Sequence, residues 1–531
     1  MSSLFIQAPC SVTLDWEDAS SLLASALHTY VDLSLSLEAK YLRVAMTSNL
    51  VERIDSKLSS LHSIMEQQLF KSRAAISRTR NRLASPLYRF PEEILSQIFM
   101  DVIHDHYPMF EGFSPLSMED HMTYTYKSLH NLLRVCSVWR NVALRRAALW
   151  STIPILGSPF GSTYSGCRLR QETELSLQRA VGAGLHLAAV LEMSDYEKTK
   201  LLPEYIPWFH SINLKSKHLH SIQNLLEMVL DAGIPPSLRE LSICHGHNIG
   251  CEISERLPHQ TDYLTLHECS HRPTFRQLIR SVSILRVSGI PFHWHSIAFS
   301  TELVELRIQS VTIGYESELN HFLKAIASAP RLRDLSIISL CAFPDPDESN
   351  ISMPPFIRLE NLKSLYLDDL YFNVLHRILI SILSASHRLT LYLNEKCLCV
   401  WEIETESGQF EEQDIEYEEM YSLLRRIEVD TLLLYGDFGD HWVTEPVLRQ
   451  LLCSMLSLKT LRMSHCDFDV ENWATLERSS LDFPRLQNLH LTAAKIFDTA
   501  GLKKVILSHS IQNLDIGASV WKGDEDSDER E

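Results

Sequence analysis

The chain has 531 residues, of which 45% are hydrophobic and 22% charged, an ordinary composition for a globular protein with room for two or three domains. Its 49 Lys and Arg residues face 67 Asp and Glu residues, so the formal net charge is −18 at pH 7. This charge argues against non-specific binding to nucleic acid or to an anionic membrane, because both require a basic protein surface.

Cysteine usage and hydropathy predict a cytoplasmic or nuclear protein. The 11 cysteines are scattered and form no CxxC pair, which is typical of reduced thiols rather than of disulfides. The sequence contains no stretch of about 20 uninterrupted apolar residues, so no membrane span is predicted. The N-terminus lacks the basic start and long apolar run of a signal peptide. We therefore expect neither a membrane nor a nucleic-acid partner.

The N-terminal region is predicted to be helical after a flexible segment, residues 1–18. Residues 19–84 contain neither Pro nor Gly. Two interpretations fit this region: a coiled coil that self-associates through residues 19–83, or an amphipathic helix pair packed on its own chain. Apolar residues recur there mostly at spacings of three and four, at Val44, Val51, Ile54, Leu58, Leu61 and Met65.

A short helix is predicted at "RFPEEILSQIF", residues 89–99. Ser85-Pro86 ends the preceding helix, because a residue before Pro is disfavoured in the helical region. Pro91 suits the first turn of the new helix, where its missing N–H is not needed. Glu92 and Glu93 complement the positive helix end. A single apolar stripe at helical spacing consists of Ile94, Leu95, Ile98 and Phe99.

A second helical segment follows an insertion. Residues 100–128 are rich in His, Tyr, Met and Pro and have weak periodicity, so we predict an inserted loop there. Residues 129–150, which include "LLRVCSVWRNVALRRAALW", are again helical in pattern. Their shared apolar side consists of Leu132, Leu133, Cys136, Trp139, Val142 and Ala143, and Leu149 and Trp150 close the segment.

From about residue 203 the chain repeats the pattern LxxLxL. Neighbouring copies are 21 to 30 residues apart, except for one 41-residue gap, and this is the period of leucine-rich repeats. Clear copies occur at Leu238/Leu241/Ile243, Leu303/Leu306/Ile308, Leu332/Leu335/Ile337, Leu362/Leu365/Leu367, Leu458/Leu461/Met463, Leu486/Leu489/Leu491 and Ile511/Leu514/Ile516. Degenerate copies occur at Leu264/Leu266, Leu285/Val287, Leu391/Leu393 and Leu432/Leu434.

Amphipathic helices between the copies predict a curved α/β solenoid with a parallel sheet. "ELNHFLKAIASAP", "LHRILISILSAS" and "VLRQLLCSML" each place apolar residues at i, i+3, i+4 and i+7. One such unit cannot bury its apolar face alone, whereas stacked units can. An ordinary α/β domain with Leu-rich strands is the alternative. We expect a linker and cap at 156–202, the repeats at 203–520 with an acidic insertion at 402–419 that is a solvated loop, and an acidic tail at 521–531.

Residues 87–153 resemble an F-box, within a domain that we place at 85–155. The family pattern has an apolar–Pro pair, an acid and an apolar helix, and then an "xxVCxxW" helix and a terminal "LW". The two halves lie about 20 residues further apart here than in a compact F-box. The whole chain resembles leucine-rich-repeat F-box proteins of the type abundant in mushroom-forming fungi. The matching residues are Phe90, Pro91, Glu93, Ile94, Leu95, Ile98, Phe99, Val135, Cys136, Trp139, Leu149 and Trp150.

This resemblance implies the substrate-recognition subunit of an SCF-type (cullin–RING) ubiquitin ligase. The small all-α F-box module would dock on the Skp-type adaptor of the cullin complex, and the repeats would hold an unknown protein substrate. The alternative is a leucine-rich-repeat interaction scaffold with no ligase role. An exposed apolar stripe at 91–99 favours the first, and a stripe buried against the repeats favours the second. The implied adaptor contacts are Leu87, Pro91, Ile94, Leu95, Ile98, Val135, Cys136 and Trp139, although Trp139 fits a core position equally well.

By analogy with the repeat fold, the variable positions of LxxLxL would line the concave strand face and contact the substrate. The candidates are Arg307, Ser336, Tyr366, Arg462 and His490.

No catalytic, cofactor or metal site is predicted, so we expect a non-enzymatic protein. Neither GxGxxG, GxxxxGK[ST], GxSxG nor HExxH occurs. Three His/Cys clusters lack the paired spacing of zinc sites. Cys244 and Cys269 are expected as small buried thiols at strand ends, and His267 and His271 on the solvated side. The clusters are Cys244/His245/His247/Cys251, His267/Cys269/His271 and His293/His295. A hydrolase or metalloenzyme on an α/β frame is the least favoured alternative.

Overall fold

A computed structural model gives the structure of this chain. It divides into two compact units, residues 1–91 and residues 92–531. None of the helices in the described part of the chain is long and apolar enough to cross a membrane. The structure describes residues 11–41, 48–84, 87, 90–104, 117–156, 173–180, 182–192, 199–246, 256–264, 266, 271–346, 354–383, 387–403, 410–436, 444–478 and 482–520.

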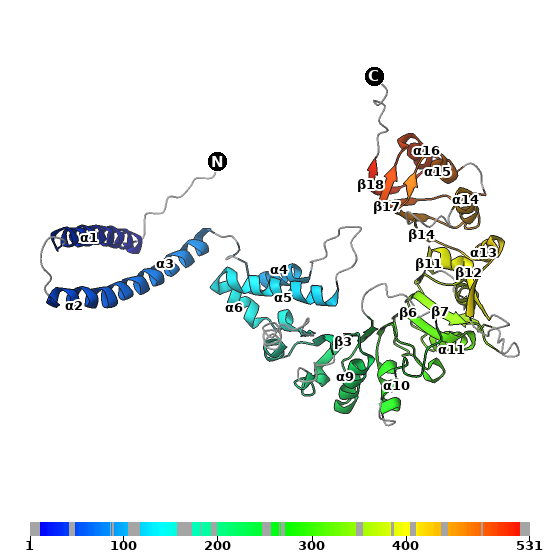
Figure 1. Ribbon diagram of the computed structural model, residues 1–531, viewed down its shortest axis with the longest axis horizontal. Coiled ribbons are helices and arrows are strands. Elements are labelled where there is room, and N and C mark those ends of the chain that lie inside the picture. Colours follow the sequence, from blue (N-terminus) through cyan, green and yellow to red (C-terminus); the bar gives the residue numbers. More distant parts are fainter. Residues whose placement is uncertain are drawn as a thin grey trace, which may run out of the picture. The chain divides into compact units, whose positions relative to one another are not determined.

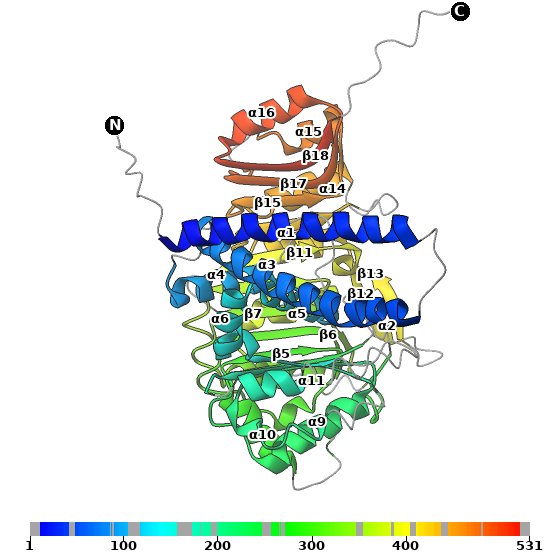
Figure 2. The same ribbon diagram turned by 90° about the vertical axis from the view of Figure 1, so that its left-hand side faces the viewer.

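The first unit is an antiparallel pair of long helical segments (Figure 2). Helix α1 (Ser11–Tyr41) runs opposite to the continuous segment formed by α2 (Ser48–Lys57), the π-helical turn η1 (Leu58–His62) and α3 (Ser63–Ala84). The helices predicted for residues 19–84 are therefore present, apart from residues 42–47, which lie outside the described residues. The flexible segment predicted at 1–18 is wrong from Ser11 onward.

The second unit begins with three short helices that pack on one another. These are α4 (Glu92–His104), α5 (Met118–Val135) and α6 (Ser137–Arg145), and a 3₁₀ turn, η3 (Ala147–Trp150), follows them. The loop predicted at 100–128 is wrong at both ends, since α4 continues to His104 and α5 starts at Met118. The segment 129–150, predicted as one helix, breaks at Cys136 and Arg146, which both have extended backbones.

Fourteen strands form one sheet in which every neighbouring pair is parallel. Its strands follow the chain in order, except that β16 and β18 both pair with β17. They are β1 (Thr152–Leu156), β2 (Leu185–Leu191), β3 (Phe209–Ser216), β4 (Glu240–His245), β5 (Ile284–Ser288), β6 (Glu305–Tyr315), β7 (Asp334–Phe343), β9 (Ser364–Asp368), β11 (Arg388–Leu393), β14 (Thr431–Tyr435), β15 (Thr460–Ser464), β16 (Asp467–Phe468), β17 (Asn488–Ile496) and β18 (Asn513–Val520).

Helices cover the outer side of this sheet, and its inner side is left to the strands except where α5 lies over the first of them, so that the second unit is a curved solenoid of the leucine-rich-repeat type (Figure 1). The parallel strands and intervening helices predicted from LxxLxL are confirmed. The helices are α9 (Leu219–Ala232), α10 (His271–Ser281), α11 (Glu316–Ile326), α12 (Phe372–Ser381), α13 (Tyr417–Leu424), α14 (Glu445–Cys453), α15 (Val470–Leu476) and α16 (Thr499–His509), with 3₁₀ turns η4 (Ile206–Trp208), η5 (Trp294–Ser296) and η7 (Glu395–Leu398).

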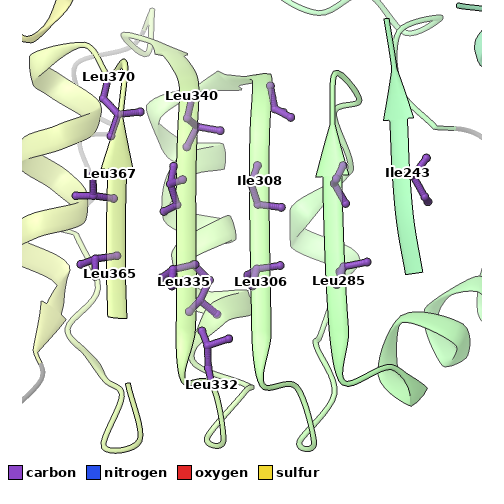
Figure 3. Close-up of a cluster of buried hydrophobic side chains, with 14 of the residues drawn as sticks. Ile243, Leu285, Leu306, Ile308, Leu332, Leu335, Leu340, Leu365, Leu367 and Leu370 are labelled. Atoms are coloured by element: carbon purple, nitrogen blue, oxygen red, sulfur yellow. The ribbon is translucent and has the colours of Figure 1, made fainter. Parts of the chain in front are cut away.

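The leucines of successive copies stack in rows across the strands (Figure 3). Leu285, Leu306, Leu335 and Leu365 pair in register from β5 to β9 and are at most 2% exposed. Because alternate residues of a strand point to opposite faces, these rows face the helices, and the intervening residues face the inner side. The buried rows hold the repeats together, and the inner rows are available for contacts with other molecules.

The solenoid differs from the prediction in three places. It starts at Thr152 rather than near residue 203, so the expected linker contains β1 and β2. Leu264 and Leu266 form no strand in the described residues, and β4 pairs directly with β5. The acidic stretch 402–419 is not a loop throughout, because it includes the end of β12 (Cys399–Ile403), β13 (Phe410–Asp414) and the start of α13, although residues 404–409 lie outside the described residues. A second small sheet pairs β8 (Ile357–Arg358) with β10 (Ile382–Leu383).

A left-handed backbone residue recurs at the same place in successive repeats, two residues after the last apolar residue of the LxxLxL pattern. Ser310, Ser339 and Asp369 have φ values of 52°, 50° and 53°. Gly289 has φ 71° at the equivalent place, where a Cβ would collide with the carbonyl of His245. Residues other than Gly are uncommon in this region, so these positions store strain that the surrounding repeats must hold.

The helices before the solenoid share its core. Leu95 and Phe99 of α4 belong to the same buried cluster as the strand leucines. Met122 of α5 packs in a smaller buried cluster with Ala188 and Val190 of β2. The hydroxyl of Tyr126 also donates a hydrogen bond to the Thr152 carbonyl at 2.8 Å. The domain boundary predicted at residue 155 is therefore wrong, because α4, α5, α6 and the repeats form one folded unit.

Candidate docking helices and concave strand face

One apolar stripe of α4 is buried. Leu95, Phe99 and Ile103, at i, i+4 and i+8, are 2%, 0% and 1% exposed. The ring of Phe99 lies 5.0 Å from that of Trp139 of α6, centroid to centroid. This stripe joins α4 to α6 and to the repeat core. Leu95, one of the expected adaptor contacts, is therefore a core residue without accessible surface for a partner.

A second apolar stripe of α4 lies one residue earlier and is open to solvent. Ile94 is 48% exposed and Val102 is 39% exposed, and Ile98 between them is half-buried. The stripes are separated by the 100° rotation between consecutive residues of a helix. The apolar arc of α4 is thus wider than its packing within this unit requires. Val102 was not among the residues predicted from the sequence.

The second half of the motif has mixed roles. Val135, the last residue of α5, is 57% exposed. The Sγ of Cys136 accepts a hydrogen bond from the backbone N–H of Trp139 at 3.5 Å, so Cys136 caps the start of α6. Trp139 is half-buried and packs against the core. Among these three residues, Val135 is the one with the largest free apolar surface.

Leu87 and Pro91 belong to the first unit, whereas α4 belongs to the second. Leu87 is half-buried and Pro91 is exposed. The backbone N–H of Phe90 donates to the Leu87 carbonyl at 3.3 Å, and α4 begins at Glu92.

The inner face of the sheet carries the five predicted substrate contacts in two different rows. Arg307, Ser336 and Tyr366 lie directly opposite one another on β6, β7 and β9. Arg462 and His490 face each other on β15 and β17. The five residues do not share one row, because the register of the leucine pattern shifts by two residues at β11.

Three alternating leucines in β11 cause this shift. Leu389 and Leu391 align with the leucine pair of β9. On the other side of the strand, Leu391 and Leu393 align with Leu432 and Leu434 of β14. Each neighbouring strand therefore matches a complete pair of leucines, but not the same pair.

The inner face begins beyond α5, which covers the strands at its N-terminal end. The α5 carboxylate of Glu119 accepts from Nζ of Lys215 on β3 at 3.2 Å. On the next strands, Arg286 of β5 lies between two acids and binds both. Its Nε donates to Glu305 at 2.7 Å, and its Nη1 donates to Glu240. The guanidinium is already satisfied, so this part of the face has little free charge.

Tyr366 and Asp368 form a half-buried polar pair on β9. The Tyr366 hydroxyl donates to the Asp368 carboxylate at 2.9 Å. Burial raises the pKa of Asp368 to about 6, although the hydrogen bond from Tyr366 and the charge of Arg307 act to lower it. Burial and the Asp368 charge together raise the pKa of Tyr366. Sequence reasoning identified Tyr366 but missed Asp368, whose signal is an acid directly after the last leucine of the copy.

Asp369, the next residue, is held by donors from two neighbouring repeats. Its carboxylate accepts from the Ser339 hydroxyl and from the amide of Asn394, and it lies 3.3 Å from Nζ of Lys396. Burial opposes the charge, but these hydrogen bonds and the Lys396 charge together lower the pKa of Asp369. Two consecutive carboxyl groups thus have pKa values shifted in opposite directions.

A polar ladder crosses the last strands. The Asn513 amide donates to Asn488 at 2.7 Å, and the Asn488 amide donates to Thr460 at 2.8 Å. In the adjacent row, the ring of His490 lies 3.5 Å from the carboxylate of Asp515, and Arg462 is exposed. The C-terminal end of the face therefore offers hydrogen-bonding groups and an exposed cation.

The described histidines of the three His/Cys clusters contact residues outside their clusters, and the rings of His293 and His295 also lie 5.8 Å apart, centroid to centroid. His271 is 8% exposed, and its Nε2 lies 2.8 Å from Asp231, so its predicted solvated position is wrong. Cys244 is half-buried at the end of β4. The His293 ring stacks on Tyr263. Within the described residues no group of three or more His, Cys, Asp or Glu side chains is placed to bind a metal. Outside the described residues lie His247, Cys251, His267 and Cys269.

Known proteins resemble this chain in structure but not at the level of a family model. No family model matches this chain, and no curated protein matches it. Among solved structures, the leucine-rich repeat-containing protein LegL7 from Legionella pneumophila is similar with a TM-score of 0.32 and 14% sequence identity. The match covers 68% of this chain and 97% of that chain.

Proposed function

We propose that this chain is the substrate-recognition subunit of an SCF-type (cullin–RING) ubiquitin ligase. In this proposal α4 and the start of α6 dock on a Skp-type adaptor, and the inner strand face holds a protein substrate. The observation that carries it is the open stripe of Ile94, Ile98 and Val102 on α4, within a segment that resembles an F-box.

The chemistry of the open stripe suits helix-in-groove recognition. Apolar residues at i, i+4 and i+8 are the anchors by which an amphipathic helix enters an apolar groove. Leaving Ile94 and Val102 exposed has no benefit for the folding of this chain, since burial of such side chains is worth roughly 1.5–3 kcal/mol each. Val135, exposed at the end of α5, would extend the same apolar contact.

The proposal requires no catalytic group in this chain. A receptor accelerates ubiquitin transfer by holding the substrate near a loaded enzyme, which raises the effective concentration of the reacting groups. The shared core supports this role, because a rigid connection between α4 and the repeats fixes where a bound substrate lies.

The inner face would recognise its substrate through mixed polar contacts. Arg307 is exposed in the same row as the half-buried Tyr366 and donates a hydrogen bond to Gln309, whereas Arg286 is paired with two acids. An aromatic hydroxyl and a carboxyl group on β9 and an exposed guanidinium on β6, two strands away, select for a partner with complementary donors and acceptors. Such an arrangement gives specificity more than raw affinity.

A titration of the full chain with a Skp-type adaptor tests the proposal. The variant Ile94→Asp with Val102→Asp places two charges on the open stripe, and we expect a loss of binding of about 100-fold or more. The matched control is Leu507→Asp, which charges an apolar side chain of α16 that is 79% exposed, and it should bind as the wild type does. Equal affinity of the wild type and the double variant would refute docking through this stripe.

A leucine-rich-repeat interaction scaffold without a ligase role is the second candidate. The burial of Leu95, Phe99 and Ile103 in the core shared with the repeats favours it, because this part of the apolar arc has a structural use. Absence of adaptor binding by the folded wild-type chain, together with retention of a partner that needs Tyr366 or Arg307, would select the scaffold.

A further inference from the structure

The helical unit at residues 1–91 contains more apolar surface than it buries. Every described side chain of α1 other than Leu27 is exposed, and none in η1 or α3 is buried. Yet α1 is apolar on all sides, with Leu22, Leu23, Val31 and Leu35 between 49% and 72% exposed. A helix that is apolar all round is normally enclosed by other helices. The second helical segment of this unit covers one side of α1 at most.

A wide groove separates the two helical segments. Its volume is about 1250 Å³, and its lining is mainly aliphatic. The segments meet at Tyr30, whose ring lies edge-on to that of His62 at 6.1 Å between centroids. A groove of this size has room for several large side chains, and the side chains of the unit itself do not fill it. The aliphatic residues that line it are Val31, Leu33, Leu35, Leu37, Leu50, Ile54 and Leu58.

The spacing along α1 is that of a helix which packs lengthwise on other helices. Apolar residues alternate at spacings of four and three over the whole helix, which is the a/d pattern of a coiled coil. The aromatic members of this series are exposed, with Trp16 at 48% and Tyr30 at 37%. The series consists of Val12, Trp16, Ala19, Leu23, Ala26, Tyr30, Leu33 and Leu37.

The two segments have opposite charge. Helix α1 has five acids and one Lys, a formal charge of −4 with His neutral. Helix α3 has one acid, Glu66, and five Lys or Arg residues, a formal charge of +4. In the described part of this unit, no ion pair joins α1 to α3; the ion pair present, His28 with Asp32, lies within α1. The opposite charges are therefore available for pairing with another molecule.

We propose that this helical unit is a homodimerisation module, in which the occupant of the groove is the same unit of a second copy of the chain. With two-fold symmetry, the acidic α1 of each copy faces the basic α3 of the other, and the charge contact is made twice. The leucines of both grooves are then enclosed in a four-helix bundle. A partner of different sequence would need to carry both an acidic and a basic apolar helix.

The available surface is sufficient for a stable dimer. A helix of 31 residues is about 46 Å long and roughly 10 Å wide, so two such helices present a face of roughly 900 Å². One partner of a standard interface contributes about 800 Å². The face of this unit is therefore of the right size without a contribution from residues 92–531.

Sedimentation of the full chain at micromolar concentrations tests this proposal. We expect the wild type to have twice the mass of one chain. The variant Leu33→Asp with Leu37→Asp should weaken association by about 100-fold or more, because charges replace apolar groups inside the bundle. The control Leu507→Asp, in α16, should remain dimeric. A monomeric wild type, or a dimeric double variant, would overturn the proposal.

Charge reversal separates self-association from simple unfolding of α1. Asp15→Lys with Asp18→Lys makes α1 less acidic in one chain, and Arg78→Glu with Arg80→Glu makes α3 less basic in another. Each variant alone should dimerise more weakly than the wild type, whereas an equimolar mixture should recover association as a heterodimer. A mixture that associates no better than its two components would contradict the proposed contact between α1 and α3.

Discussion

Ser339 and Asp369 both have left-handed backbones in neighbouring repeats, and the Ser339 hydroxyl donates a hydrogen bond to the Asp369 carboxylate. Each residue occupies a strained conformation two residues after the last apolar residue of its LxxLxL copy. The bond between them thus stabilises two strained backbone positions at once. Asn394 and Lys396 of the following repeat complete the contact, so that three repeats are connected on the inner side as well as through their leucines.

We expect Asp369→Ala to lower the free energy of unfolding by about 3 kcal/mol, since it removes hydrogen bonds to a charged group and places Ala in a left-handed conformation. Asp369→Asn should cost clearly less, because Asn tolerates this conformation and keeps an acceptor oxygen. Denaturant unfolding of the full chain measures both. Equal destabilisation by the two variants would show that the backbone strain has no part in the effect.

Asp368 predicts a pH dependence of stability with a defined sign. Its pKa in the folded protein is about 6, above the ordinary 3.8, so the fold binds the proton more tightly than the unfolded chain does. Its ionisation therefore destabilises the fold progressively as the pH rises from about 4 to 6. Asp368→Asn should be more stable than the wild type at pH 7 and equal to it below about pH 4. Thermal unfolding across this pH range tests the prediction.

Asp369→Asn is the control for that titration, because the pKa of Asp369 is lowered rather than raised. Its ionised carboxylate contributes stability above the ordinary pKa of 3.8, and this contribution is lost as the pH falls through the lowered folded value. The variant should therefore be less stable than the wild type at pH 7, with the difference vanishing in acid. A difference of the same sign for both Asn variants would contradict the assignment.

The two stripes of α4 should separate stability from docking. Leu95→Ala is expected to lower the free energy of unfolding by about 2–5 kcal/mol, because it leaves a cavity in the shared core. Ile94→Ala should change it by at most about 1 kcal/mol, since Ile94 is 48% exposed. Adaptor binding should respond in the opposite order, with the larger loss for Ile94→Ala when both variants are folded. Calorimetric titration after a check of folding distinguishes the two.

The helices before the solenoid should not fold when cut from it. A fragment of residues 84–155 would keep Thr152 of β1 without β2, and would expose Met122 and Tyr126. We expect this fragment to aggregate or to lack a cooperative transition, whereas a fragment of residues 84–520 should unfold cooperatively. Circular dichroism during heating compares them. A cooperative transition in the short fragment would mean that α4, α5 and α6 form an independent domain.

Much of the solenoid could be predicted from the sequence, because the spacing of its leucines indicates where each strand lies and how it aligns with its neighbours. Strands β4, β6, β7, β9, β15, β17 and β18 all lie at clear LxxLxL copies. Strands β1 and β2 could not be found in this way, since "TIPIL" and "LHLAAVL" lack the first leucine of the pattern. In β3, "FHSINLKS" keeps the spacing at Phe209, Ile212 and Leu214, but with a single leucine. The reverse error occurred at Leu264 and Leu266, where leucines alternate without forming a strand.

The surfaces were less predictable than the core because they depend on tertiary neighbours. The apolar stripe of α4 was recognised, but its division into Leu95 inside and Ile94 outside depends on where α5 and α6 pack. The shifted pKa of Asp368 depends on burial by strands that are distant in sequence. Helix α5 was not predicted in full, because its first half lies in a segment of weak periodicity. Its start is set by Ser117, whose hydroxyl accepts a hydrogen bond from the backbone N–H of Asp120.

Because a single core connects α4 to the repeats, the number of strands between α4 and a residue of the inner face sets the distance between them. Each parallel strand adds about 4.8 Å along the sheet. Duplication or deletion of one repeat would therefore move every residue beyond it by that step, while the docking helices and the recognition residues stay intact. Under the proposed function, genetic gain or loss of repeats would change which lysines of a bound protein come within reach of the ubiquitin-loaded enzyme, without any substitution in either binding surface.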